Sequence, residues 1–427
     1  MRPSLQDKYM DDVVQFSHQN NEPDWFTKIR TDNLEKSSDL SLPRYEKINY
    51  RSWRLDRPTD FDAKSVATTY EPATSKNYIV QAGGKTLDVH LQPELAAKGV
   101  ILTDIFTAIK DYPELIQKYY MTKVVKADEN KLTAIHAAMM NGGIFLYVPK
   151  NVQVEDSIQA TFVQDNNIKR DFNQHILLVA EDNSEVTYLE NFITNGDAEE
   201  NKGNIVAEVI AGDNTHVHYS ALDQLSESTT SYLSRRGITG ANARIDWAIG
   251  FMNDGNVIGD FGTDLLGDGS HTEAKVVAIT TGEQVQGIDT KVTNYGRHTI
   301  GHIMQHGVIL ESSTLTFNGV GHIVKGARGS DAQQESRVLM LSRHARGDAN
   351  PILLIDENDV TAGHAASVGR VNEEQMYYLM SRGIDESTAQ RLVIRGFLSS
   401  VITEIPEEEV RDRLTQMIER KLINGQQ

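Results

Sequence analysis

The pattern of apolar positions begins with helical spacing. Residues 4–20 carry apolar side chains along one helical face, and Ser4 with Asp7 three residues later forms a capping pair. Between residues 95 and 143 two further runs show the 3.6-residue period, and a pair of glycines ends the second run. We therefore predict a helical and mixed N-terminal region over residues 1–150.

From about residue 156 the pattern becomes that of short strands. No segment of helical period interrupts it for about 190 residues, and turn-forming pairs such as Asn195-Gly196 and Asn318-Gly319 separate many of the strands. This predicts an all-β core over residues 151–360, of the sandwich, barrel or solenoid type. The expected strands are Ile158–Val163, His175–Val179, Glu185–Leu189, Ile205–Ile210, His216–Ala221, Ala243–Ile249, Lys275–Thr281, Thr299–Leu310, Thr314–Phe317 and Val338–Leu341.

The end of the chain returns to helical patterning, which predicts a C-terminal helical domain over residues 361–427. Asp385 caps one helix, and Pro406 begins another that is acidic in its first turn and basic in its last. The last helix carries an apolar stripe made of Val410, Leu414, Met417 and Ile418. This stripe either packs on the core of the chain or docks a partner.

One histidine, His364, lies where the strand and helix patterns meet. An apolar run at Ile352–Ile355 predicts a buried strand before it, and Asn372 with Gln375 predicts a capped helix after it. The intervening segment TAGHAASVG consists almost entirely of small residues and is expected to be a turn. Small residues allow another backbone to approach closely, so His364 is expected to project into a tight space. The alternative is a structural histidine packed at a domain junction.

Charge and composition narrow the classes of partner. The formal net charge is −18 and aromatic residues make up only 7%, so binding to nucleic acid or to an anionic membrane is disfavoured. No apolar run approaches the ~18–20 residues of a spanning helix. The first residues are polar and acidic and do not resemble a signal peptide, which predicts a cytoplasmic protein.

The absence of cysteine restricts the chemistry further. With no cysteine, the chain has no disulfide, no thiolate nucleophile and no all-thiolate site for an iron–sulfur cluster. Any ligand that it offers to iron must be histidine or carboxylate, and any thiolate must come from a partner. A permanent cluster carrier acting alone is therefore excluded, whereas a site shared between subunits is not.

The remaining histidines are weaker candidates for a metal site. His298, His302 and His306 share one face of an expected strand, but positions four apart lie ~13 Å from one another, too far to share one ion. We interpret them as residues of a sheet face. His216 and His218 alternate on another strand and could hold a metal with a carboxylate from elsewhere, although the sequence identifies no third ligand.

Two enzyme alternatives fit poorly. The sequence GGKT at residues 83–86 lacks the upstream glycine and following helix of a phosphate-binding loop, so we expect a turn and no ATP hydrolysis by this chain. The acidic residues between Asp254 and Glu273 could act on sugars, as in some β-solenoid enzymes. The lack of a signal peptide and the scarcity of aromatic residues disfavour that activity.

The stretch Asp348–Gly383 resembles the C-terminal part of the SufB/SufD family of iron–sulfur cluster assembly scaffolds, and more closely its SufD branch. Glu22–Pro43, Asn141–Asn151 and Ser336–Pro351 resemble other segments of that family, so the resemblance covers essentially the whole chain. It implies that the β core is a right-handed β-helix, a choice that the pattern alone leaves open.

The resemblance also implies a function. Members act as non-enzymatic scaffolds, so a SufB-like subunit and a SufC-like ABC ATPase are the expected partners, the ATPase docking on the C-terminal helices 372–422. Without the SufB-like subunit, the chain could pair with a second copy of itself. The matching histidine of the family faces the partner's cysteine where a nascent cluster forms, which makes His364 a candidate transient iron or cluster ligand. Members often carry a cysteine just before this histidine; here Ala362 and Gly363 stand there, so only the imidazole contributes. No permanently bound cofactor is expected, only a transient iron–sulfur cluster shared with a partner.

Overall fold

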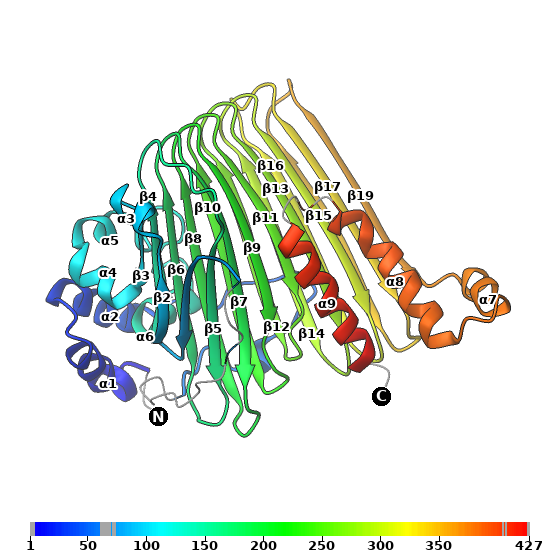
Figure 1. The fold of residues 1–427 in the computed structure, drawn as a ribbon, viewed down its shortest axis with the longest axis horizontal. Helices are drawn as coiled ribbons and strands as arrows, with labels where there is room; N and C mark the ends of the chain where they lie inside the picture. The colour runs from blue at the N-terminus through cyan, green and yellow to red at the C-terminus, as the bar shows by residue number, and fades with distance from the viewer. Residues whose placement is uncertain (1–4, 60–69, 71–73, 404, 406–407, 425–427) are drawn as a thin grey trace.

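The computed structural model describes residues 5–59, 70, 74–403, 405 and 408–424. Its centre is a β-solenoid made of two facing sheets, with one set of helices at the N-terminal end and another on one face (Figure 1). This confirms the predicted mainly-β class and, among the three alternatives for the core, the solenoid.

The two sheets contain alternate strands of the chain. Sheet A has ten strands in the order β19 (Thr361–Arg370), β17 (Asp331–Met340), β15 (Ile300–Ile309), β13 (His271–Thr280), β11 (Arg244–Phe251), β9 (His216–Gln224), β7 (Glu185–Asn195), β5 (Ile158–Asp165), β1 (Asn77–Ala82) and β2 (Lys85–His90). Sheet B has nine strands in the order β18 (Arg346–Ile355), β16 (Thr314–Ile323), β14 (Val285–Asn294), β12 (Val257–Leu265), β10 (Thr229–Thr239), β8 (Asn201–Ala211), β6 (Phe172–Ala180), β4 (Gly142–Val148) and β3 (Ile101–Asp104).

Successive coils of the solenoid stack in parallel register. His216 pairs with Arg244, which pairs in turn with His271, and the same row continues through Ile300 and Asp331. Equivalent positions therefore lie side by side at each coil. Because side chains alternate between the two faces of a strand, every row faces either the lumen between the sheets or the outside.

Asparagines support the turns between coils. Asn183, Asn214 and Asn242 occupy equivalent turns, each with a positive φ of 52–57°. Asn214 donates to the side chain of Asn183 at 3.1 Å, and Asn242 donates to Asn214 at 3.3 Å. Asparagine tolerates this left-handed conformation better than most residues. His298 lies in a later turn, just before β15, and also has a positive φ, of 56°. The expectation that it lies on a strand with His302 and His306 is therefore wrong.

The ten predicted strand segments are found in the structure, but two predicted turns are wrong. Asn318-Gly319 lies inside β16, because Asn318 joins a row of polar side chains across sheet B, donating to Asp289 at 2.6 Å and accepting from Asn350 at 2.8 Å. The small-residue segment around His364 is β19, because it pairs in register with β17. The solenoid therefore runs past the expected boundary at residue 360.

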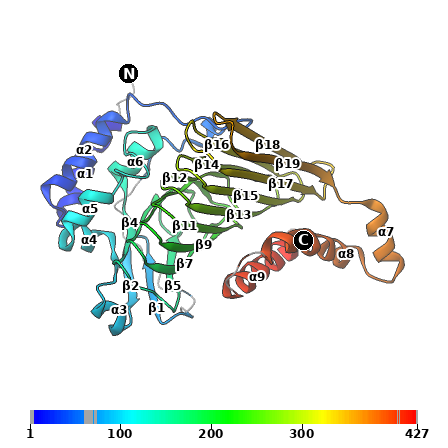
Figure 2. The same cartoon turned by 90° about the horizontal axis from the view of Figure 1, so that it is seen from above.

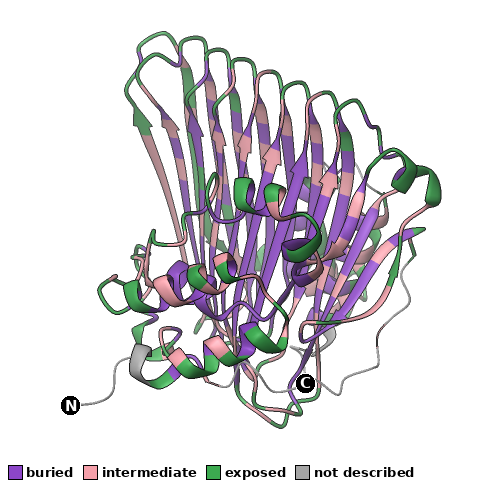
Figure 3. Cartoon of the chain, turned by 90° about the vertical axis from the view of Figure 1, so that its left-hand side faces the viewer, coloured by how far each residue is buried: buried purple, intermediate pink, exposed green. Residues whose placement is uncertain are grey.

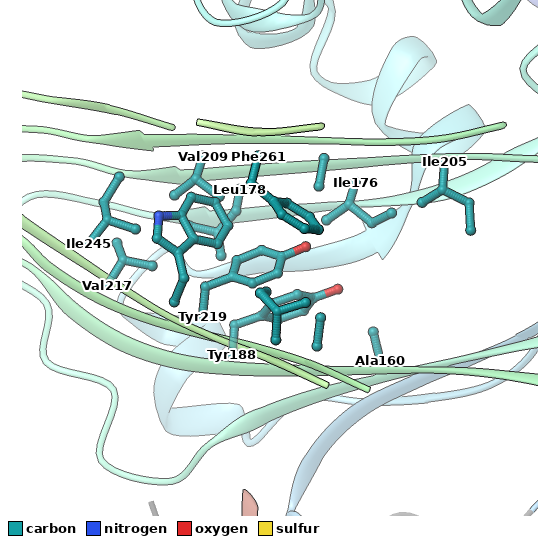
Figure 4. Packing of buried hydrophobic residues seen from close by; sticks show 14 of the residues in the cluster. Ala160, Ile176, Leu178, Tyr188, Ile205, Val209, Val217, Tyr219, Ile245 and Phe261 are labelled. Carbon is teal, nitrogen blue, oxygen red and sulfur yellow. The ribbon is translucent and has the colours of Figure 1, made fainter. Parts of the chain in front are cut away.

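Aromatic and aliphatic side chains fill the lumen in the N-terminal half of the solenoid. Tyr188 and Tyr219 point from sheet A toward Phe261, Ile176 and other side chains of sheet B (Figure 4). Both tyrosine rings are fully buried, with centroids 5.0 Å apart. Burial of this apolar surface is the main force that holds the sheets together.

A charged group is buried within the same lumen. Arg235 of β10 donates through Nε to Glu190 of β7 at 2.7 Å and through both terminal nitrogens to Asp223 of β9 at 2.6 and 3.0 Å. The hydroxyls of Tyr188 and Tyr219 donate to the second oxygen of Glu190. Burial raises the pKa of both carboxyls, and the positive charge of Arg235 opposes that shift. The group thus links the two sheets through the lumen.

The N-terminal helices cover the outer face of sheet B, where the strands beneath them are buried (Figure 3). They are α1 (Leu5–Gln19), α2 (Asp24–Lys36), α4 (Ile105–Asp111), α5 (Pro113–Tyr119) and α6 (Lys131–Met139), with a 3-10 turn at Arg51–Trp53. The short helix α3 (Pro93–Ala97) instead packs Leu95 against the residues of the lumen. The predicted helix at residues 4–20 is confirmed over α1, while Ser4 of the expected capping pair lies outside the described residues. Residues 95–143 are less helical than predicted, because β3 interrupts them and Gly142 begins β4.

Three buried titratable groups join this region to the solenoid. His136 of α6 donates from Nδ1 to the carbonyl of Asn204, which can only accept. His136 Nε2 therefore accepts from His175 Nδ1 at 3.0 Å, which leaves His175 Nε2 as an acceptor 3.3 Å from Glu208. A protonated Glu208 can donate to that nitrogen. Consistent with this arrangement, burial raises the pKa of Glu208 to about 8 and lowers that of His175 to about 3.

The first prediction concerns Glu208→Gln. Glutamine is uncharged at every pH, as the neutral acid is, although its NH2 must replace one of the two oxygens that accept from the Met121 and Val125 amides, which lowers its stability by an amount independent of pH. The folded-state pKa of Glu208 lies above its unfolded value, so the stability from its neutral form is present at low pH and is lost as pH rises to about 8. The stability of Glu208→Gln relative to wild type should therefore grow from pH 5 to 8, by up to about 1.4 kcal/mol per pH unit. Urea unfolding at several pH values measures this, with the exposed Glu227→Gln as control. A difference independent of pH would contradict the assignment.

The C-terminal helices lie on the opposite side of the solenoid, against the outer face of sheet A (Figure 2). Those in contact with the sheet are α8 (Glu386–Ile402) and α9 (Glu408–Asn424), while α7 (Glu373–Ser381) projects away from it. The predicted Asp385 cap is present and accepts from the Thr388 amide at 2.9 Å. All four residues of the α9 stripe are buried in a group with Leu222, Val277 and Val308 of the sheet. The stripe thus packs on the core of the chain itself, the first of the two alternatives.

Candidate functional site

His364 lies on β19, the last strand of sheet A. It pairs in register with Gln334 of β17, and the same row on the earlier coils comprises Ile303, Ala274, Trp247, Tyr219 and Tyr188. Members of this row point into the lumen: Trp247 and the tyrosines are buried there, and Gln334 donates to the carbonyl of Ile352 in the opposite sheet at 2.8 Å. His364 is therefore the last member of a lumen-facing row.

The solenoid is open at the end where His364 lies. Within the described part of the chain, β18 and β19 each have only one neighbouring strand in their sheet, and both form the edge seen at the right of Figure 2. No further coil covers the lumen there, so His364 is exposed. The described residues do not form the expected tight space around its imidazole; such a space would form when another surface covers the open end.

The open end has the features of an interface. Its strand edges present unpaired backbone N–H and C=O groups, which favour pairing with another chain. Small side chains at Ala362, Gly363 and Ala365 keep the surface of β19 flat. Leu354 and Val368 are 45% and 41% exposed, unusually high values for large apolar residues of a sheet.

The lumen just below His364 is polar. Gln305 donates to the hydroxyl of Thr290 at 2.9 Å and accepts from the hydroxyl of Ser336 at 2.9 Å. Gln334 is 4% exposed, and its Oε1 has no hydrogen-bond partner. The open end therefore combines one exposed imidazole with buried polar groups, unlike the aromatic lumen farther from it.

His364 is a single potential ligand. None of the groups of three metal-ligating side chains found among the described residues includes it. A metal or cluster at the open end would thus need its other ligands from a different molecule. This agrees with the hypothesis of a shared site, which rests on the exposure and direction of His364 and on the lack of cysteine.

His306, one of the weaker candidates for a metal site, makes contacts within the chain. His306 lies on the outer face of β15, where its Nε2 is 2.8 Å from Glu335 and its ring stacks on Phe397 of α8. Burial lowers the pKa of His306. Its neutral imidazole holds α8 against the sheet and is not a ligand.

The structure does not support the two enzyme alternatives considered from the sequence. The acidic residues between Asp254 and Glu273 are distributed over both sheets, since Asp260 and Asp264 lie on β12 of sheet B and Glu273 lies on β13 of sheet A. They do not line one groove. Of residues 83–86, the two glycines form the turn between β1 and β2, as predicted, and Lys85 and Thr86 begin β2. Among the described residues, no helix has both the length and the apolar character needed to cross a membrane.

The sequence analysis missed an exposed aromatic surface on α7. This helix projects away from the solenoid (Figure 2), and Tyr377 and Tyr378 are 75% and 57% exposed. Met380 of the same helix is 43% exposed, while Met376 is buried. The two adjacent tyrosines in the sequence could have indicated this surface, because a helix that packs by one face usually carries polar residues on the other.

Comparison with known proteins gives two matching family models. Residues 162–397 match the model described as "SUF system FeS cluster assembly, SufBD core domain". Residues 72–160 match the model described as "SufBD protein N-terminal region". The matched ranges include most of the solenoid and part of the C-terminal helices.

Curated relatives match along nearly the whole chain. The chain is 47% identical over 426 residues to the iron–sulfur cluster assembly protein SufD of Bacillus subtilis (strain 168), a match that covers 95% of this chain and 96% of the relative. It is 26% identical to an iron–sulfur cluster assembly SufBD family protein of Staphylococcus aureus (strain MRSA252), over 93% of this chain and 89% of the relative. The similarity therefore extends through both sets of helices.

Proposed function

Because the chain belongs to the SufBD family of iron–sulfur cluster assembly proteins, we propose that it is a non-catalytic scaffold subunit of a cytoplasmic assembly complex. The observation that carries this proposal is the open end of the solenoid, where His364 faces an uncovered lumen beside two unpaired strand edges. A scaffold needs such a surface, because a cluster built there must remain accessible for transfer.

The proposed partner at the open end is a SufB-like subunit. Stacking a second solenoid end on β18 and β19 would satisfy the backbone groups of both edges and bury Leu354 and Val368. A second copy of this chain can occupy the same surface when the SufB-like subunit is absent. In either complex the partner would close the space around His364.

Within that interface His364 is proposed to supply one imidazole to the nascent cluster, whose remaining ligands come from the partner. Neutral imidazole binds iron, and mixed histidine and thiolate ligation of clusters is established chemistry. A chain that contributes one ligand holds its cargo less firmly than one that contributes four. This suits a site from which the finished cluster must leave.

The proposed partner at the C-terminal helices is a SufC-like ABC ATPase. Since the stripe of α9 is buried against sheet A, α9 cannot offer it to another protein. The exposed residues Tyr377, Tyr378 and Met380 of α7 are available instead. Aromatic residues and methionine are enriched at protein interfaces, so we place the ATPase contact on α7.

The second prediction tests the assembly as a whole. The three proteins are co-expressed under anaerobic conditions, and this chain is used to isolate its partners. Both partners should co-purify, and the complex should show the visible absorbance of an iron–sulfur cluster. A chain that isolates neither partner would contradict the scaffold function.

A variant separates the two proposed contacts. Replacing Tyr377 and Tyr378 by serine should release the ATPase while the SufB-like subunit still co-purifies. Tyr295→Ser is the matched control, because Tyr295 is 46% exposed but lies far along the chain, after β14. Retention of the ATPase by the double variant would exclude α7 as its docking site.

A further inference from the structure

A row of histidines and carboxylates crosses the outer face of sheet A. His271 and Glu273 lie two residues apart on β13 and therefore share one face of that strand. His302 of β15 is the direct register partner of Glu273. One ligand atom from each of these three residues lies within 4.8 Å of the others. We call His271, Glu273 and His302 the β13–β15 triad.

The imidazoles of the triad lack the partners that buried histidines normally have. The Nε2 atoms of His271 and His302 are buried, and neither has a hydrogen-bond partner. Their nearest carboxylates are 3.6 Å away, at Glu273, and 3.7 Å away, at Asp331. Buried nitrogens without a hydrogen bond are costly, and a metal ion bound between them would remove that cost.

The surroundings also favour ligation. The side chains of the triad are 23%, 26% and 39% exposed, so the triad lies near the surface although its two Nε2 atoms are covered. Lys275 binds one oxygen of Glu273 at 2.6 Å and thereby orients the other oxygen toward His271. Arg244 lies 3.6 Å from that oxygen but bonds primarily to Asp246, at 2.6 Å. The arginine therefore does not occupy the ligand position.

We propose that the β13–β15 triad binds one first-row divalent transition metal ion, through the imidazoles of His271 and His302 and the oxygen of Glu273 that Lys275 does not bind. Two histidines and one carboxylate form the set that binds Zn²⁺ in hydrolases and Fe²⁺ in non-haem enzymes. An adjustment of about 1 Å brings three atoms at this spacing to the ~2.1 Å ligand distances of such an ion. The site is distinct from His364, which faces the lumen, and it does not depend on the proposed scaffold function.

A second group of the same kind provides a comparison. Glu185, His216 and His218 also place three ligand atoms within 4.8 Å of one another, on β7 and β9. Here His216 Nε2 already bonds to Asp246 at 2.9 Å, and Glu185 is exposed. One imidazole is thus already engaged and the carboxylate is solvated, so we expect this group to bind an ion more weakly than the β13–β15 triad.

The third prediction is a metal titration. The untagged full chain is titrated anaerobically with Zn²⁺, Fe²⁺ and Co²⁺, using calorimetry and the visible d–d absorption of Co²⁺. The wild type should bind one equivalent tightly, and His302→Ala should weaken that binding by at least about 10–100-fold. Glu273→Gln keeps the size of the side chain and should have a similar effect, which guards against a folding defect in the alanine variant.

Two controls make the result specific. His322→Ala removes a half-buried histidine from the outer face of sheet B, and His216→Ala alters the comparison group. Both variants should still bind one equivalent of metal ion tightly. Absence of a tight equivalent in the wild type, its survival in His302→Ala, or its loss in His216→Ala or His322→Ala would overturn the proposal.

Discussion

Arg235→Met is expected to destabilise the protein by about 3–5 kcal/mol, the usual cost of removing one partner from a buried ionic group. Among the described residues, Arg235 is the only cation within hydrogen-bond distance of Glu190 or Asp223. The variant therefore leaves both carboxylates in the lumen without a positive partner. Both carboxyls are fully buried, so water cannot replace the guanidinium. They must take up protons or remain as uncompensated charges, and either outcome disfavours the folded state.

The adjacent arginine provides a matched control for this prediction. Arg236 follows Arg235 on β10 but faces outward, where it pairs with Glu129 and Asp260 and remains 22% exposed. Arg236→Met should therefore cost much less in urea unfolding. A further variant that combines Arg235→Met with Glu190→Gln and Asp223→Asn should recover part of the loss, because it removes the uncompensated carboxylates. If Arg235→Met and Arg236→Met lower the free energy of unfolding equally, the buried ionic group does not stabilise the protein as expected.

The β core could be predicted from the sequence because alternation and turn residues are local signals. The assembly of its coils could not be predicted in the same way. The asparagines at 183, 214 and 242 stand at corresponding turns, but their side-chain bonds form only after the coils stack. The spacing between them is uneven, and the sequence between them shows no common motif that would reveal the repeat.

The error at β19 has a related cause. Glycine and alanine have little intrinsic preference for strands, so the segment around His364 was interpreted as a turn. Register with β17 decides its conformation, which is a tertiary effect that local propensity does not contain. The importance of His364 was inferred from a family resemblance, whereas its direction into the lumen follows only from the row that contains Gln334.

The β13–β15 triad illustrates the limit more sharply. The sequence analysis considered His302 only with its neighbours along the chain, His298 and His306. In the solenoid its neighbours are His271 and Glu273, about one coil earlier in the sequence. Residues so far apart along the chain cannot be grouped without knowing the register, and a change of one residue in that register would place His302 on the opposite face of the sheet.

The largest functional effect is expected for His364→Ala. The side chain is exposed on β19 and makes no hydrogen bond or ion pair with the residues that the structure describes, so its removal should change stability by less than about 0.5 kcal/mol. The variant should therefore fold and should still isolate the SufB-like subunit and the ATPase. Cluster absorbance of the complex should fall to about a tenth or less, because loss of a ligand is at least as severe as loss of an outer-shell contact.

The controls for His364→Ala separate a ligand from a spacer. His344→Ala removes another exposed histidine, from the segment between β17 and β18, and should leave cluster formation unchanged. His364→Cys replaces the imidazole by a thiolate, which also binds iron, and should restore part of the absorbance. If His364→Ala forms clusters as the wild type does, the open end serves only as a spacer that supports its partner. If the variant loses its partners together with the cluster, His364 acts through the interface and not as a ligand, since a ligand role requires an intact complex that lacks its cargo.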